Sequence, residues 1–162
     1  MIYDACGMTD QMHTELGKGF IDESPIEANV FLELFDSNGN LKDSRTVHNT
    51  VTTAGKNGVA DQVLESPTLV KANWMAVGTG TPSGTALGTE LDRNALTSKT
   101  RSNAVVTMVG DWAAGDATGA LTEAGTFDQS SLGGNMWMSA SFAVINKAAA
   151  DTLKITWTLT FS

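Results

Sequence analysis

A glycine-rich run is the first candidate for chemistry in this sequence. Residues 76–91 read AVGTGTPSGTALGTEL and follow the apolar stretch NWMAV, the order expected of a phosphate-binding loop after a strand. A dinucleotide fingerprint places glycine at the first, third and sixth positions; Gly78 and Gly80 fit, but Ser83 occupies the sixth. A P-loop requires a lysine inside the run, and there is none. The run therefore predicts a turn or loop, and we expect no cofactor.

The other polar residues form no recognised metal or catalytic pattern. Residues 36–40, DSNGN, begin like a calcium loop, but leucine and valine hold the positions where an EF-hand needs glycine and its last carboxylate. The two histidines, His13 and His48, show no metal-ligand spacing, and the single cysteine, Cys6, cannot form a disulfide within the chain. There is no G-x-S-x-G nucleophile elbow. We therefore expect neither a metal site nor an enzyme.

The charge balance argues against nucleic acid as a partner. The formal net charge is −8, and residues 1–50 hold nine Asp and Glu against three Lys and Arg. A phosphate backbone is bound by clustered Lys and Arg, which this sequence lacks. Within the acidic region, Asp22 and Glu23 could serve as a glycosidase carboxylate pair, although acid-rich segments are usually solvated. We name Asp22, Glu23 and Glu27 as candidate interface residues instead.

The start of the chain is predicted to lie outside the folded domain. Residues 1–27 show no sustained hydrophobic period, which predicts an extended arm, although a short helix over TDQMHTELG is compatible with its residues. The first ten residues lack the order of a signal peptide, and no window approaches the roughly 18 apolar residues of a membrane helix. We expect a chain that folds in the cytosol and enters no membrane.

Residues 28–162 are predicted to form a single, mainly β domain. ANVFLELF and LKDSRTVHNT flank Asn38-Gly39, a strong hairpin signal. Further strand candidates are separated by Gly, Asp, Asn and Ser; they are residues 72–78, 94–100, 102–113, 119–128, 135–145 and 151–161. Half-buried strands joined by short loops favour an antiparallel β-sandwich of the jelly-roll kind.

One helix is expected near residues 53–65, within VTTAGKNGVADQVLES. Apolar residues recur four apart from Val59 onward, and Pro67 stops the run. Gly55 and Gly58 weaken such a helix in isolation, so packing of its apolar face must support it.

Two strand candidates show which face is buried. In residues 151–161 the apolar side chains alternate with Thr and Lys; they are Leu153, Ile155, Trp157, Leu159 and Phe161. In residues 135–145 one face is predicted to be apolar, with Met136, Met138, Ala140, Phe142 and Val144. Trp137 lies on the other face with two serines, so it either reaches an interface or is covered by an opposing loop. Trp137 is the fourth candidate interface residue.

A carboxylate interrupts one of the apolar strands. Glu123 lies in GALTEAGTF among small and apolar residues. Burying a carboxylate is costly unless it is paired or hydrogen-bonded. We predict Arg93 or Arg101 as its structural partner.

Several segments of the sequence, taken in order, form a recognisable combination of motifs. They are NTVTTAGKNGVADQVL, WMAVGTGT, TALGTELDRNAL, GALTEAGTFD, GGNMWMSASF and DTLKITWTLTFS. This series resembles small virion structural proteins of tailed bacteriophages and covers residues 28–162, without the arm.

The resemblance implies a structural protein of the phage virion with no catalytic site. The first hypothesis is a capsid decoration (cement) protein that binds the major capsid protein on the outside of the head. Closed symmetry favours a homotrimer, with residues 1–27 ordering on neighbouring subunits. The alternative is a tail or fibre adaptor that contacts a receptor or glycan. A third hypothesis is a non-virion enzyme or host-modulating protein.

Overall fold

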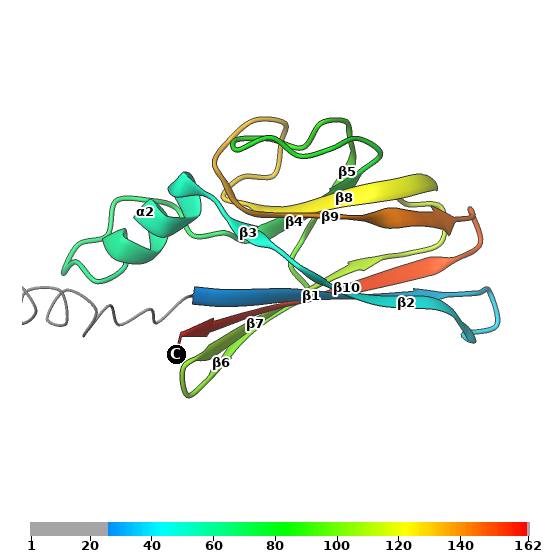
Figure 1. The fold of residues 1–162 in the computed structure, drawn as a ribbon, viewed down its shortest axis with the longest axis horizontal. Helices are drawn as coiled ribbons and strands as arrows, with labels where there is room; N and C mark the ends of the chain where they lie inside the picture. Colours follow the sequence, from blue (N-terminus) through cyan, green and yellow to red (C-terminus); the bar gives the residue numbers. More distant parts are fainter. Residues whose placement is uncertain (1–25, 162) are drawn as a thin grey trace, which may run out of the picture.

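The computed structural model describes residues 26–161, which form a sandwich of two five-stranded antiparallel sheets with a helix at one end (Figure 1). The strands are β1 (Ile26–Phe35), β2 (Leu41–His48), β3 (Thr50–Val51), β4 (Trp74–Gly78), β5 (Glu90–Ala95), β6 (Ser98–Ser102), β7 (Val105–Trp112), β8 (Gly119–Phe127), β9 (Met136–Lys147) and β10 (Thr152–Phe161). The helix is α2 (Thr53–Asp61). The predicted all-β sandwich with one short helix is confirmed. Of the predicted arm, residues 1–25 lie outside the described residues, and Ile26 and Glu27 already belong to β1.

Hairpins alternate between the two sheets. One sheet has the order β2-β1-β10-β7-β6, and the other has the order β3-β9-β8-β4-β5. Hairpins β1–β2 and β6–β7 lie in the first sheet, β4–β5 and β8–β9 lie in the second, and β10 returns between β1 and β7. Helix α2, the start of β1 and the last residues of β10 lie together at one end, which we call the α2 end (Figure 1).

The predicted hairpin turn joins β1 to β2. Gly39 has φ +81°, a conformation that favours glycine. The Asp36 carboxylate accepts the backbone N–H groups of Asn38 at 2.8 Å and Asn40 at 2.9 Å. The carboxylate that suggested a calcium loop is therefore used to hold the turn.

The alternation in β10 places its apolar face in the core. Leu153, Ile155, Trp157 and Leu159 are buried against the opposite sheet, as predicted, and the intervening Thr and Lys side chains face outward. Phe161, the last of the series, is 37% exposed because it lies at the α2 end, where the opposite sheet no longer covers it.

The predicted strand 94–100 is wrong, because the chain changes sheets inside it. The Leu96 N–H donates to the Asn73 carbonyl next to β4, whereas the Thr97 N–H donates to the Val109 carbonyl of β7. Residues 90–95 therefore form β5 of one sheet, and residues 98–102 form β6 of the other.

The predicted apolar face of β9 breaks near its middle. Leu121 pairs with Ile145 but Glu123 pairs with Ser141, so β9 holds two extra residues across this interval. Ile145 is buried in place of Val144, which is 46% exposed, and the prediction for Val144 is wrong. The Arg45 guanidinium of β2 donates to the Ala143 and Val144 carbonyls in this irregular stretch. An inward-facing arginine thereby joins the edges of the two sheets.

Helix α2 begins at its predicted residue and ends four residues early. Thr52 caps it by accepting the Gly55 N–H at 3.0 Å. Beyond Asp61 the chain continues in tighter turns, with the Val63 N–H donating to the Ala60 carbonyl. Within residues 26–161, no helix has the length and apolar character that a membrane crossing requires.

Candidate functional site

The glycine-rich loop surrounds a carboxylate that belongs to the protein itself. Glu123 on β8 is fully buried. Its Oε1 accepts the N–H groups of Gly80 at 2.9 Å and Thr89 at 2.8 Å, and its Oε2 accepts the Gly88 N–H at 2.8 Å. The Thr122 hydroxyl donates to the Gly80 carbonyl at 2.7 Å. The donors that suggested a phosphate-binding loop are thus occupied by an internal anion. We call Glu123 and the three donor residues the carboxylate cradle.

Glycine is required in the cradle and next to it because backbone and carboxylate atoms lie too close for a Cβ atom. A Cβ on Gly78 would lie 2.3 Å from the Thr89 carbonyl oxygen and 2.5 Å from Glu123 Oε1. A Cβ on Gly88 would lie 2.4 Å from the Thr81 carbonyl oxygen. Because backbone atoms cannot move aside cheaply, side chains at these positions would push the loop away from the carboxylate.

The predicted arginine partner of Glu123 is wrong. Arg93 pairs instead with Glu90, with Nη2 to Oε2 at 2.6 Å, and its guanidinium lies 3.7 Å from the Phe127 ring centroid. Arg101 donates to a backbone carbonyl of its own hairpin. The Arg93 guanidinium also donates to three backbone carbonyls, those of Gln129, Ser131 and Gly133. Arg93 therefore holds the β8–β9 loop and leaves Glu123 to backbone donors.

Trp137 lies beneath helix α2. A Cβ on Gly58 would lie 2.3 Å from Cζ2 of the indole, and a Cβ on Gly55 would lie 2.1 Å from the Trp137 carbonyl oxygen. The capping residue Thr52 also donates its N–H to that carbonyl at 3.0 Å. The two glycines that weaken the helix in isolation are the residues that let it touch β9. The sequence left two alternatives for Trp137, an interface or coverage by an opposing loop. The structure shows coverage, and the covering element is helix α2 and not a loop.

An apolar groove of about 270 Å³ opens beside Trp137 at the α2 end. Residues from α2 and from strands of both sheets line it; they are Val59, Gln62, Lys71, Ala72, Lys99, Val106, Met108, Trp137, Met138, Leu159 and Phe161. Among residues 26–161, Lys71 and Lys99 are its only charged lining residues, and no acidic side chain of that part of the chain lines it. The groove is therefore apolar within and positively charged.

The two groove lysines lack carboxylate partners among the described residues. Lys99 Nζ donates to the Ala72 carbonyl at 2.8 Å and to Asn73 Oδ1 at 2.6 Å, both uncharged acceptors. Burial lowers the pKa of Lys99, and the positive charge of Lys71 lowers it further. Burial acts by removing water from the charged ammonium, whereas Lys71 acts by repulsion between like charges.

The segment after α2 adds exposed apolar side chains to the same end. In residues 62–70, which we call the α2 loop, Val63 is 84% exposed, and Leu64, Leu69 and Val70 are also exposed. Large apolar side chains gathered at one place mark an interaction surface. This surface was not predicted from the sequence. Four apolar residues close to Pro67, two before it and two after it, are a signal that could have indicated it.

Asp61 fixes the shape of the α2 loop. Its Oδ2 accepts the N–H groups of Thr68 and Leu69, each at 2.9 Å, and its Oδ1 accepts the Thr68 hydroxyl at 3.1 Å. These hydrogen bonds, from Leu69 first, hold the pKa of Asp61 below its usual value. The exposed leucines and valines are therefore presented on a loop that is tied back to the helix.

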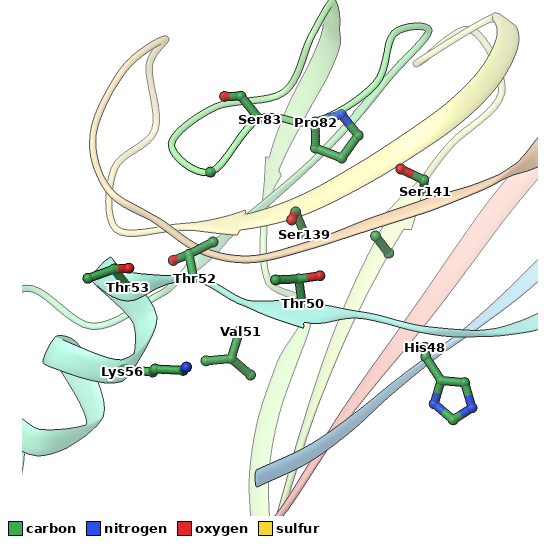
Figure 2. A pocket seen from close by; sticks show the side chains of 12 residues that line it. His48, Thr50, Val51, Thr52, Thr53, Lys56, Pro82, Ser83, Ser139 and Ser141 are labelled. Atoms are coloured by element: carbon green, nitrogen blue, oxygen red, sulfur yellow. The ribbon is translucent and has the colours of Figure 1, made fainter. Parts of the chain in front are cut away.

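A second, polar cavity of about 560 Å³ lies where β3, β9 and the glycine-rich loop meet (Figure 2). Its lining is rich in hydroxyl groups and includes no acidic residue; the residues are His48, Thr50, Val51, Thr52, Thr53, Lys56, Pro82, Ser83, Gly84, Ser139, Ala140 and Ser141. Within residues 26–161, no hydrogen bond joins His48 to a hydroxyl group, so the cavity shows no formed nucleophile and base. Its chemistry suits hydrogen bonding to a polar ligand.

The predicted interface residues do not come together in the described structure. Trp137 lines the apolar groove, whereas Glu27 is exposed on β1 and is not among the groove residues. Asp22 and Glu23 lie outside the described residues. Their role in an interface stays a prediction.

Comparisons with models of known protein families, with curated protein sequences and with solved structures found no match. Among residues 26–161, no group of three His, Cys, Asp or Glu side chains is placed to hold a metal ion.

Proposed function

We propose that the protein is a structural component of a tailed-bacteriophage particle, a decoration protein that binds the major capsid protein on the outside of the head. The observation that carries the proposal is the α2 loop at the α2 end, where four large apolar side chains are exposed: Val63, Leu64, Leu69 and Val70. Apolar surface of this kind is stabilised when a partner covers it. The sequence resemblance to phage virion proteins supplies the identity of that partner.

Two other parts of the sandwich satisfy their own polar groups, which suits such a role. The buried carboxylate has three donors, and the edge strand β2 turns Arg45 inward toward β9. An edge blunted in this way resists pairing with other chains. Contact with a partner is then directed to the α2 end. We propose a homotrimer as the bound form, since closed symmetry matches threefold positions of an icosahedral shell.

The test is the copy number of this chain relative to the major capsid protein in purified particles, measured by quantitative mass spectrometry. A decoration protein is expected at an abundance comparable to the capsid protein. A few copies per particle would instead indicate the tail or a fibre. Complete absence from particles would overturn both structural roles and leave the non-virion protein.

The role of the α2 end is tested with matched surface variants. Leu64→Asp with Val70→Asp should abolish binding to heads that lack the protein, because both side chains are exposed in the α2 loop. Leu132→Asp is the control, since Leu132 is 78% exposed but belongs to the β8–β9 loop and not to the α2 loop. Equal binding by both variants would contradict the proposed docking surface.

A second candidate function, a tail or fibre module that contacts a receptor or glycan, is favoured by the polar cavity in Figure 2. Hydroxyl groups from Thr50, Ser139 and Ser141 line it and can bind the hydroxyls of a sugar. A glycan array with purified protein tests this candidate. Binding that is lost in Ser139→Val would support it, and no binding to any glycan would count against it.

A further inference from the structure

The lining of the apolar groove at the α2 end defines the kind of ligand that fits it. Its lining is apolar apart from one glutamine and two lysines, and those lysines have no carboxylate partner among the described residues. A fitting ligand therefore carries bulky apolar groups next to negative charge. A polypeptide segment of that kind has adjacent apolar and acidic residues.

The sequence of this chain contains such a segment. Residues 20–23 read Phe-Ile-Asp-Glu, two bulky apolar residues followed by two acids. Residues 1–25 as a whole hold five Asp and Glu and a single lysine. Residues 20–23 thus match the groove in both polarity and charge, and residues 1–25 as a whole match it in charge.

The segment also enters the described structure beside the groove. Ile26, the first residue of β1, pairs with Phe161, which lines the groove. Only residues 22–25 separate Ile21 from Ile26, so the two residues lie at most about 17 Å apart when the chain is extended. Pro25 fixes its own φ and restricts Ser24 to extended conformations, which disfavours a reversal into the groove of the same molecule. A neighbouring molecule offers the same groove without that reversal.

We propose that the groove binds Phe20 and Ile21 of a second copy of this chain, with Asp22 and Glu23 facing Lys71 and Lys99. Each copy then gives one segment and receives one, and in a closed symmetric oligomer every groove is filled. The inference rests on the oligomer of the proposed function and deepens it by naming the contact between copies; the experiments below test that contact whether or not the oligomer decorates a capsid.

Disulfide trapping in the full-length protein tests the exchange directly. Two variants are made in a Cys6→Ser background, one with Ile21→Cys and one with Val59→Cys, and they carry tags of different mass. Mixing them under mild oxidation should give a covalent heterodimer. Leu132→Cys replaces Val59→Cys in the control, because Leu132 is exposed but does not line the groove. Circular dichroism confirms that each variant is folded.

Each outcome of the trapping experiment decides the inference. A heterodimer with Val59→Cys and none with Leu132→Cys supports exchange between copies. A disulfide that forms only when Ile21→Cys and Val59→Cys share one chain places the segment in its own groove and overturns exchange. Equal or absent cross-linking with both partners overturns the groove as the binding site.

Association measured by analytical ultracentrifugation gives an independent readout. Phe20→Asp with Ile21→Asp should weaken self-association at least tenfold, and Lys71→Glu should weaken it less. Met12→Asp, an apolar residue elsewhere in residues 1–25, and Lys154→Glu, on the outer face of β10, are the matched controls. A wild-type chain that stays monomeric at its highest soluble concentration would overturn the inference. The copy number in particles, by contrast, reports on the proposed function alone.

Discussion

The carboxylate cradle and the α2 end differ in how far their charged and apolar groups find partners within the described part of the chain. In the cradle, a fully buried carboxylate finds three backbone N–H donors within 2.9 Å. At the α2 end, two lysines face an apolar groove without a carboxylate, and four large apolar side chains remain exposed. Groups that are satisfied within the chain stabilise the fold, whereas groups left unsatisfied are available to a partner. This difference separates the structural region from the candidate binding region, although both contain glycines that permit close contact.

Removal of the cradle carboxylate is expected to have the largest effect on stability. Glu123→Ala leaves the three N–H groups of the cradle without their acceptor, and we expect the free energy of unfolding to fall by about 3–5 kcal/mol. Glu123→Gln should also destabilise, because its amide NH₂ faces donors. Urea denaturation measures both, with Glu65→Ala in the exposed α2 loop as control. A loss as small as that of the control would show that the loop does not depend on Glu123.

Crowding the contact between helix α2 and β9 is expected to have the next largest effect. Gly55→Ala places a Cβ against the Trp137 carbonyl, and we expect a loss of about 1–3 kcal/mol. The helix preference of alanine, about 1 kcal/mol over glycine, acts in the opposite direction and is outweighed. Gly84→Ala, where a Cβ would meet nothing within 4 Å, is the control. Thermal unfolding compares the two, and a stabilised Gly55→Ala would contradict the close packing.

Replacing an exposed apolar residue of the α2 end should hardly change stability. Val63 is 84% exposed, so Val63→Asp should alter the free energy of unfolding by less than about 0.5 kcal/mol. The same variant is expected to weaken binding to the partner of this surface. Denaturation and binding are measured on one preparation. A large loss of stability would show that Val63 belongs to the fold and would remove the contrast between the two regions.

Acid is expected to loosen the α2 loop in a narrow pH range. The pKa of Asp61 is lowered in the folded protein, so its contribution to stability is fully present above the unfolded value of 3.8 and is lost as the pH falls through the lowered folded value. Carboxyl NMR titration gives that folded pKa directly. In Asp61→Asn the amide exchange of Thr68 and Leu69 should be faster at neutral pH. An unshifted Asp61 titration would contradict the hydrogen-bonded loop.

Much of the fold could be predicted because local patterns carry it. Alternation of apolar residues indicated the buried face of β10, and Asn38-Gly39 indicated the β1–β2 turn, where only Gly39 adopts positive φ. The start of helix α2 followed from its spacing. The change of sheet between Leu96 and Thr97 was missed, since two consecutive N–H groups donate to different sheets without any mark in their side chains.

The candidate site was less predictable than the fold. Composition and spacing pointed to Trp137 but not to the groove beside it, because the groove joins residues from α2, β7, β9 and β10 that are far apart along the chain. Lys71 and Lys99 looked like ordinary surface lysines in the sequence. Only their shared position shows a concentration of positive charge.

The sequence by itself determined the strand periodicity, the hairpin turn and the need of Glu123 for a partner, because these depend on the type and spacing of neighbouring residues. The tertiary structure alone decided that this partner is the backbone of the glycine-rich loop and that Gly55 and Gly58 seat a helix on Trp137. The physical reason is the same in both cases. Nearly every residue offers a backbone N–H, and a glycine permits close contact wherever it lies, so only the folded arrangement reveals which of these groups meet.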